Sequence, residues 1–136
     1  MERPDQLVDI IHQVALVSLP ILAAVIFHEV AHGAMALRLG DDTASRLGRL
    51  TLNPLPHIDP VGTILMPVLL LLAGAPIFGY ARPVPVNYSQ LRNPRRDMVL
   101  VALAGPGTNI VLAILSAIAL RLLAPYVSDL SPDADS

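Results

Sequence analysis

The chain has 136 residues, a length typical of one domain, but its composition does not suit a water-soluble one. Hydrophobic residues make up 54% of the chain, charged residues make up 15%, and the mean hydropathy is +0.60. The formal net charge of −2 and the absence of an arginine cluster interleaved with aromatic residues argue against a nucleic acid partner. Because the chain contains no cysteine, it cannot form a disulfide, a thiolate metal site or a cysteine nucleophile.

Three stretches without charged side chains follow one another along the chain, at residues 10–28, 60–81 and 98–120. Each is long enough to approach or cross a bilayer core of about 30 Å. We therefore expect an all-α membrane protein with two or three transmembrane helices and the lipid bilayer as its surroundings. The acidic start of the chain, "MERPDQLVD", argues against a cleaved signal peptide.

The first apolar element predicts one membrane helix over residues 7–39. Its apolar core is interrupted only by Ser18 and by Pro20, which we expect to kink the helix. Arg38 in the last turn and Gly40 just beyond it are ordinary stop signals. The sequence therefore predicts both that this element is a helix and where the helix ends.

The region between the first and last helices, residues 41–97, gives mixed signals. The stretch "GRLTLNP", residues 48–54, alternates leucine with polar neighbours and predicts a short β-strand. Residues 60–81 are apolar but contain prolines and glycines, so this segment either spans the bilayer or enters it and returns. Residues 80–96 cannot begin as a helix, because Pro83 and Pro85 push the residues before them away from helical dihedral angles.

The arginines decide between these topologies, with residues 98–123 predicted as the last transmembrane helix. If all three apolar segments span, the arginines divide five against four between the two sides. If only the first and last span, seven arginines lie between them and two lie outside, and the positive-inside rule places residues 41–97 in the cytoplasm. We therefore favour a single membrane-embedded domain, residues 1–136, with two spans and a re-entrant segment packed against them.

The candidate chemistry lies in "FHEVAHG", residues 27–33. His28 and His32 are one helical turn apart, so both imidazoles can bind one metal ion from the same face. Glu29 is placed to act as the general base toward water, which is the logic of the H-E-x-x-H pattern. An ionisable side chain at the end of a membrane helix is costly unless it faces a partner or a cavity, and this context strengthens the assignment.

Two other interpretations of this motif stay open. The three side chains could simply cap a helix end at the membrane interface. They could also bind a metal ion without catalysis, as in a transporter, with Glu29 as a ligand or proton carrier.

Two further segments also have alternative interpretations. Residues 80–87 could be a surface crossover stiffened by prolines, or an extended edge to which an unwound substrate adds as a strand. Asn109 lies in an apolar helix, where an amide needs a partner; it could anchor packing or form a hydrogen bond near the active site. Gly105, Pro106 and Gly107 are expected to form a close-approach and kink site against the first helix.

The chain resembles the site-2 proteases, which are intramembrane zinc metalloproteases, and within them the short prokaryotic members. The resemblance rests on "FHEVAHGAMALRLGD", "GRLTLNPLPHIDPVGT", "FGYARPVPVN" and "LRNPRRDMVLVALAGPGTN", and it extends over residues 15–123. It implies a Zn²⁺-dependent metalloendopeptidase that cleaves membrane-embedded protein substrates, with His28 and His32 as metal ligands and Glu29 as the catalytic base. It also implies a multi-pass protein of the prokaryotic inner membrane whose active site faces the cytoplasm, in agreement with the arginine count.

The chain departs from the family pattern at the third zinc ligand. The resemblance implies an aspartate in a later membrane helix, followed by glycine, and the chain contains no Asp-Gly pair. Since a catalytic zinc ion usually has three protein ligands, we expect an N-terminal portion of a longer protein. His57 and Asp59 are the alternative third ligands within the chain, whereas His12 lies about 24 Å from His28 along the helix. The competing function is a non-catalytic membrane protein that binds metal or serves as a scaffold.

Overall fold

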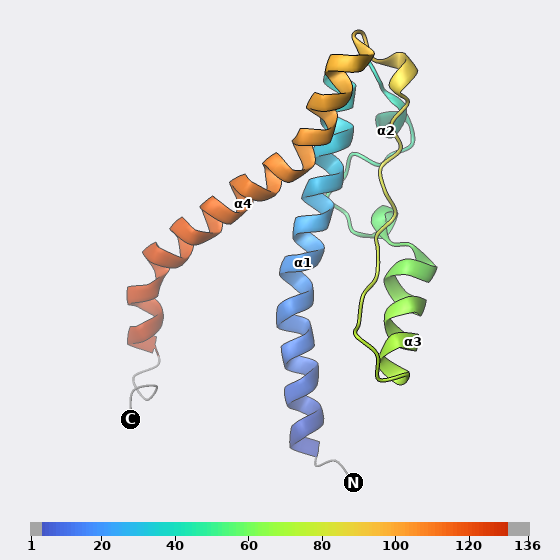
Figure 1. Ribbon diagram of the computed structural model, residues 1–136. Helices are drawn as coiled ribbons and strands as arrows, with labels where there is room; N and C mark the ends of the chain where they lie inside the picture. Colours follow the sequence, from blue (N-terminus) through green and yellow to red (C-terminus); the bar gives the residue numbers. More distant parts are fainter. Residues whose placement is uncertain (1–3, 131–136) are drawn as a thin grey trace.

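Two long helices pack together near one end of the molecule and diverge toward the other (Figure 1). The computed structural model describes residues 4–130, so the first three and last six residues of the predicted domain lie outside the described residues. Helix α1 (Pro4–Arg38) and helix α4 (Pro94–Leu130) run in opposite directions. Between them in sequence come α2 (Thr43–Arg46), η1 (Leu55–His57), η2 (Pro60–Leu65), α3 (Met66–Leu72) and η3 (Tyr88–Gln90).

Most of the apolar surface of α1 and α4 is exposed. The most hydropathic 18-residue window is 6% buried in α1 and 0% buried in α4. Large side chains such as Leu19 and Ile114 are 67% and 55% exposed. Apolar surface of this extent needs a bilayer or another protein to cover it, and each helix exceeds the roughly 20 residues that a span requires. The described residues thus form an all-α membrane protein, as the sequence predicts.

Helix α1 ends where the sequence predicts. Gly40 has a φ of +111°, a value that an L side chain rarely adopts. The Gly40 N–H donates to Leu37 O at 3.3 Å, and the Asp41 N–H donates to Ala36 O at 2.8 Å. This pair of bonds satisfies the last carbonyl groups of the helix, as in a Schellman motif, and turns the chain sideways into α2.

The middle apolar segment turns back on itself. The apolar helical stretch runs from Pro60 to Leu72. At a rise of about 1.5 Å per residue its length is roughly 20 Å, which is less than the bilayer core of about 30 Å. Beyond α3 the chain turns at Gly74, which has a φ of +68°, and runs back beside α3 (Figure 1). On its return, the Tyr80 N–H donates to Gly62 O at 3.0 Å and the Arg82 N–H donates to His57 O at 2.8 Å. The segment thus forms a short hairpin and not a helix long enough to span, and its entry into the bilayer stays a prediction.

The predicted β-strand over residues 48–54 is wrong, since the described residues 4–130 contain no strand. Hydrogen bonds with nearby side chains instead satisfy the backbone N–H and C=O groups of this stretch. The Asn53 N–H donates to Thr51 Oγ1 at 3.1 Å, the Leu55 N–H donates to Asn53 Oδ1 at 3.1 Å, and His57 Nε2 donates to Thr51 O at 2.8 Å. Thr and Asn side chains compete with sheet pairing in this way, so alternating leucines could not by themselves produce a strand.

A small core lies where α1 ends and α4 begins. Ala36, Leu91 and Val101 are buried there at 1%, 4% and 2% exposure. Beside this core, the buried Asp41 carboxylate accepts from the Thr43 N–H at 3.0 Å and from the Asn87 N–H at 2.7 Å. Burial disfavours the carboxylate, but these hydrogen bonds outweigh it and lower the pKa of Asp41 below its ordinary value. Asp41 thus ties the end of α1 to the chain that leads into α4.

The arrangement predicts that Ser45 and Gln90 face the same side of the membrane. The Arg92 N–H donates to Leu39 O at 3.1 Å, so the turn before α4 lies against the end of α1, close to α2. We expect Ser45→Cys and Gln90→Cys variants to be labelled together by a membrane-impermeant thiol reagent from one and the same face. Because the chain is otherwise free of cysteine, no background labelling is expected. Labelling of the two positions from opposite faces would contradict the re-entrant topology.

Candidate metal centre and active site

The two histidines of the motif converge on one point. His28 and His32 project from the same side of α1, and their Nε2 atoms lie 2.9 Å apart. Two imidazole nitrogens at this distance can share one cation or one proton. The motif spacing therefore places two nitrogen donors as the sequence predicts for a metal pair.

The second nitrogen of each imidazole is held by α4. His32 Nδ1 donates to Val101 O at 2.6 Å. Since a carbonyl group only accepts, this bond fixes the proton of neutral His32 on Nδ1 and leaves a lone pair on Nε2. His28 Nδ1 lies 3.1 Å from the side-chain amide of Asn109. Such outer bonds orient the ligating histidines of metal sites.

Glycine at position 105 keeps the space beside these nitrogens open. A Cβ atom built on Gly105 would lie 2.4 Å from His32 Nε2 and 2.7 Å from His28 Nε2. Val101, Gly105 and Asn109 are spaced four residues apart, so they form one stripe along α4 that faces the histidine pair. The predicted close approach of α4 to α1 thus occurs at Gly105, and it occurs directly at the candidate metal position.

Glu29 points into a separate cavity beside the histidines. Its Oε2 accepts from the Val84 N–H at 2.9 Å. The cavity has a volume of about 350 Å³ and lies between α1, the first turns of α4 and the returning chain. Its lining consists of Glu29, His32, Pro83, Val84, Val86, Tyr88, Val101 and Ala102. A carboxylate and one imidazole therefore face the same space.

Gly33 allows the returning chain to come close to Glu29. A Cβ atom built on Gly33 would lie 2.5 Å from Leu50 Cδ2 and 2.9 Å from Val84 Cγ1. Both side chains pack on α1 one turn beyond Glu29. Since Pro83 and Pro85 have no N–H group, the Val84 amide is the donor that this part of the chain can offer to Glu29.

Arg49 adds positive charge near Glu29, a role that its sequence position does not indicate. Its Nη2 donates to Arg82 O at 2.8 Å. Burial and the neighbouring Arg82 lower the pKa of Arg49, while the negative charge of Glu29 opposes that shift. Arg49 lies in the stretch "GRLTLNPLPHIDPVGT", but the motif does not show that its side chain comes near Glu29, because that depends on the loop between α2 and η1.

His57 and Asp59 do not complete the metal site. His57 is 1% exposed, and its Nε2 donates to Thr51 O. Asp59 caps η2 by accepting from the Val61 and Gly62 N–H groups, both at 2.9 Å. Among residues 4–130, no group of three His, Asp or Glu side chains lies close enough together to hold a metal ion. The alternative that either residue is the third ligand is therefore wrong for this arrangement.

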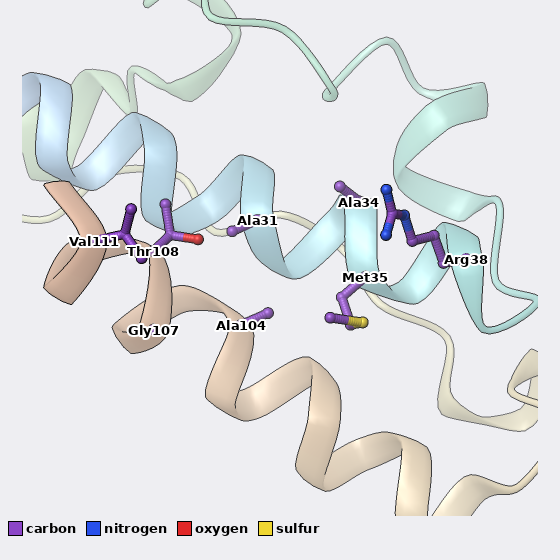
Figure 2. Close-up of a pocket in the computed structure, with 8 residues that line it drawn as sticks. All are labelled: Ala31, Ala34, Met35, Arg38, Ala104, Gly107, Thr108 and Val111. Carbon is purple, nitrogen blue, oxygen red and sulfur yellow. The ribbon is translucent and has the colours of Figure 1, made fainter. Parts of the chain in front are cut away.

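A second cavity lies between α1 and α4, away from Glu29. It has a volume of about 560 Å³ and is lined by Ala31, Ala34, Met35, Arg38, Ala104, Gly107, Thr108 and Val111. Figure 2 shows the small side chains of both helices along this groove and the Arg38 guanidinium at one end. Its lining lacks a carboxylate and an imidazole, so the chemistry lies on the Glu29 side.

Comparison with curated proteins finds relatives that share this region. The chain is 50% identical to YwhC of Bacillus subtilis over 99 residues, which are 73% of the chain and 42% of YwhC. It is 37% identical to Rip2 of Mycolicibacterium smegmatis over 95 residues, 69% of the chain and 35% of Rip2. It is also 37% identical to Rip2 of Mycobacterium tuberculosis over 103 residues, 75% of the chain and 38% of that protein. All three are named, provisionally, as zinc metalloproteases.

The chain is a homologue of these proteins. Its resemblance to the site-2 protease family is thereby confirmed. The chain spans about two fifths of the length of the curated relatives it matches, with 42% for YwhC and 35% for one Rip2. No protein-family model and no solved structure matches it.

Proposed function

We propose that the chain carries the H-E-x-x-H half of the active site of an intramembrane zinc metalloprotease. The observation that carries the proposal is the convergence of His28 Nε2 and His32 Nε2 at 2.9 Å, with the Glu29 carboxylate on the adjoining residue. The names of the homologous proteins support the same metal and the same reaction class. The exposed apolar helices support its location in a membrane.

The residues fit zinc as two of its protein ligands. Imidazole nitrogen is a preferred zinc donor, and a catalytic zinc ion usually has three protein ligands. Val101 O fixes the His32 tautomer that ligation by Nε2 needs, and Gly105 leaves room next to both nitrogens. When bound, zinc would polarise the scissile carbonyl group and make water a stronger nucleophile. We propose that the third ligand comes from a segment outside this chain.

Glu29 is proposed as the general base. Its carboxylate lies in the cavity that His32 also lines, so a water molecule there can give up its proton to Glu29 and attack a peptide carbonyl carbon. The Val84 N–H holds Oε2 at 2.9 Å, which leaves the other carboxylate oxygen available for the proton. The same proton can then pass to the leaving amine.

The proposed substrates are membrane-embedded proteins. The candidate site lies near the end of α1, next to a re-entrant segment, where a membrane helix could unwind and expose its carbonyl groups. The arginine distribution supports a cytoplasm-facing site in a multi-pass protein of the inner membrane. Both the orientation and the substrate class are parts of this proposal.

The proposal predicts different losses for the ligands and for the base. A His28→Ala, His32→Ala double variant is expected to lose zinc, measured by competition with a chromogenic chelator in detergent micelles. Glu29→Gln is expected to keep zinc but lose peptidase activity by at least about 100-fold, as general bases contribute roughly 10²- to 10⁴-fold. Peptidase activity is assayed with the protein reconstituted beside a membrane-embedded substrate.

The outcome also separates the proposal from a non-catalytic metal site. The described residues 4–130 supply two ligands rather than three, which is the observation that favours the non-catalytic alternative. Zinc binding that depends on both histidines, without peptidase activity in any protein that contains this chain, would support that alternative. Zinc binding that survives the double variant would contradict both.

A further inference from the structure

Among the described side chains of α4, Asn109 is the one that forms a hydrogen bond with the histidine pair. Its amide lies 3.1 Å from His28 Nδ1, on the opposite side of the imidazole from the Nε2 atom that faces His32. It reaches across from the helix that also supplies Val101 O. The two histidines are therefore each contacted at Nδ1 by α4, once by a backbone carbonyl and once by a side-chain amide.

The two orientations of the Asn109 amide have opposite consequences for His28. If the NH₂ group donates to Nδ1, the proton of neutral His28 must lie on Nε2, and that nitrogen cannot ligate a metal. If Oδ1 accepts from an Nδ1–H, the lone pair lies on Nε2. A half-turn of the amide exchanges these states, because its oxygen and nitrogen occupy nearly equivalent positions.

A buried polar atom favours the second orientation. With the NH₂ group toward His28, Asn109 Oδ1 is buried without a hydrogen-bond partner. A buried carbonyl oxygen with no partner is costly, and the half-turn gives it the Nδ1–H as its donor. It also gives His28 the same tautomer that Val101 O imposes on His32. Both Nε2 lone pairs then face one point, with the two nitrogens 2.9 Å apart, an arrangement that a bound cation stabilises; without a cation, a proton on His28 Nε2 would instead bond to His32 Nε2.

We propose that Asn109 is a positioning residue that accepts a hydrogen bond from His28 Nδ1–H and thereby presents His28 Nε2 to the metal. The inference rests on the proposed function of His28 as a zinc ligand. Asn109 fixes both the tautomer and the plane of the ring, and it does so from α4. The geometry of the site therefore depends on the packing of α4 against α1 as well as on the motif itself.

Two substitutions of similar size separate this role from simple packing. Asn109→Asp keeps an acceptor oxygen and cannot donate, whereas Asn109→Leu keeps the volume and has neither group. We expect Asn109→Leu to weaken zinc binding by about 10- to 100-fold, the usual effect of losing an outer partner of a ligating histidine. We expect Asn109→Asp to bind zinc at least as tightly as the parent protein. Packing alone would not make aspartate the better replacement.

The tautomer that Asn109 favours can be read directly, without zinc and without activity, in a His32→Ala protein, where no lone pair of His32 faces His28 Nε2. In ¹⁵N-histidine-labelled protein at mildly alkaline pH, long-range ¹H–¹⁵N spectra report which ring nitrogen carries the proton, and His28 is assigned by its loss in His28→Ala. We expect the Nδ1–H form of His28 in the His32→Ala protein and in its Asn109→Asp derivative, and loss of this preference in its Asn109→Leu derivative. In the parent protein, His32 is held by Val101 O and serves as the control that should show the Nδ1–H form.

The outcomes distinguish this inference from the proposed function. An Nε2–H tautomer of His28 in the His32→Ala protein, or zinc binding that is unchanged in Asn109→Leu, would overturn the role of Asn109 while leaving the zinc site intact. Failure of the His28→Ala, His32→Ala variant to lose zinc would overturn the proposed function itself.

Discussion

Replacement of Gly105 by alanine is expected to abolish zinc binding while the helices stay folded. The new methyl group would lie 2.4 Å from His32 Nε2 and 2.7 Å from His28 Nε2, a separation at which either the rings or the helix must move. Alanine is favoured over glycine in a helix by about 1 kcal/mol, so α4 itself should become more stable. We therefore expect a loss of zinc affinity of at least about 100-fold, corresponding to roughly 2.7 kcal/mol, measured by chelator competition, with unchanged helical circular dichroism.

Gly107 provides the matched control for this prediction. It lies two residues further along the same helix, and a Cβ atom built on it meets nothing within 4 Å. Gly107→Ala should therefore gain helix stability and keep full zinc binding. Equal loss in the two variants would mean that α4 responds to alanine as a whole, and equal retention would mean that the metal does not lie beside Gly105.

The elements that the sequence predicts correctly are those whose signals are local. A long apolar run ending in Arg38 and Gly40 predicts a helix and its stop, and α1 ends at Arg38. By contrast, the residues of the middle segment leave both paths open; the arginine count favours its return, and in the structure the chain turns at Gly74. The predicted strand over residues 48–54 is wrong because a strand depends on a partner strand, which the local sequence does not specify. Here the Thr51 and Asn53 side chains bond to the local backbone groups instead.

The residues of the candidate site likewise divide into those that a local signal predicts and those that depend on helix packing. The spacing of His28 and His32 is enough to predict that their nitrogens meet, because one helical turn fixes it. The contacts from α4 could not be derived, since they depend on how the two helices cross and join residues 69 and 81 positions apart in sequence. A carbonyl group such as Val101 O carries no sequence signal at all. Asn109 and Gly105 do carry one, an amide and a glycine in an apolar helix, and both proved to face the histidines.

The region between the long helices positions Glu29 of the motif. Glu29 is held by a backbone amide of the returning chain, and that chain is held in turn by Asp41 through the Asn87 N–H. The end of α1, the returning chain and the start of α4 therefore form one connected unit around the candidate site. Substitution of Asp41 should consequently lower the free energy of unfolding and leave the metal ligands unchanged.

Replacement of Asp41 by asparagine is expected to destabilise the protein by about 2 kcal/mol at neutral pH, the typical value of hydrogen bonds to a buried charged group. Asp41 is 1% exposed, and its two carboxylate oxygens accept from different segments, Oδ1 from Thr43 and Oδ2 from Asn87. An amide group must turn its NH₂ toward one of these N–H donors. The neighbouring Asp42 is the control, because its ion pair with Arg46 is exposed and Asp42→Asn should cost less than about 0.5 kcal/mol.

The pH dependence of stability identifies the charge of Asp41 as the cause. Its pKa is lowered in the folded protein, because the hydrogen bonds from Thr43 and Asn87 outweigh the effect of burial. The carboxylate therefore stabilises the fold fully above its unfolded pKa of about 3.9, and this contribution is lost as the pH falls further through the lower folded value. Thermal unfolding in micelles, followed by circular dichroism from pH 7 to pH 3, should show the parent protein approaching Asp41→Asn only at the acid end. A gap between the two proteins that stays constant down to pH 3 would show that Asp41 acts through its shape rather than through its charge.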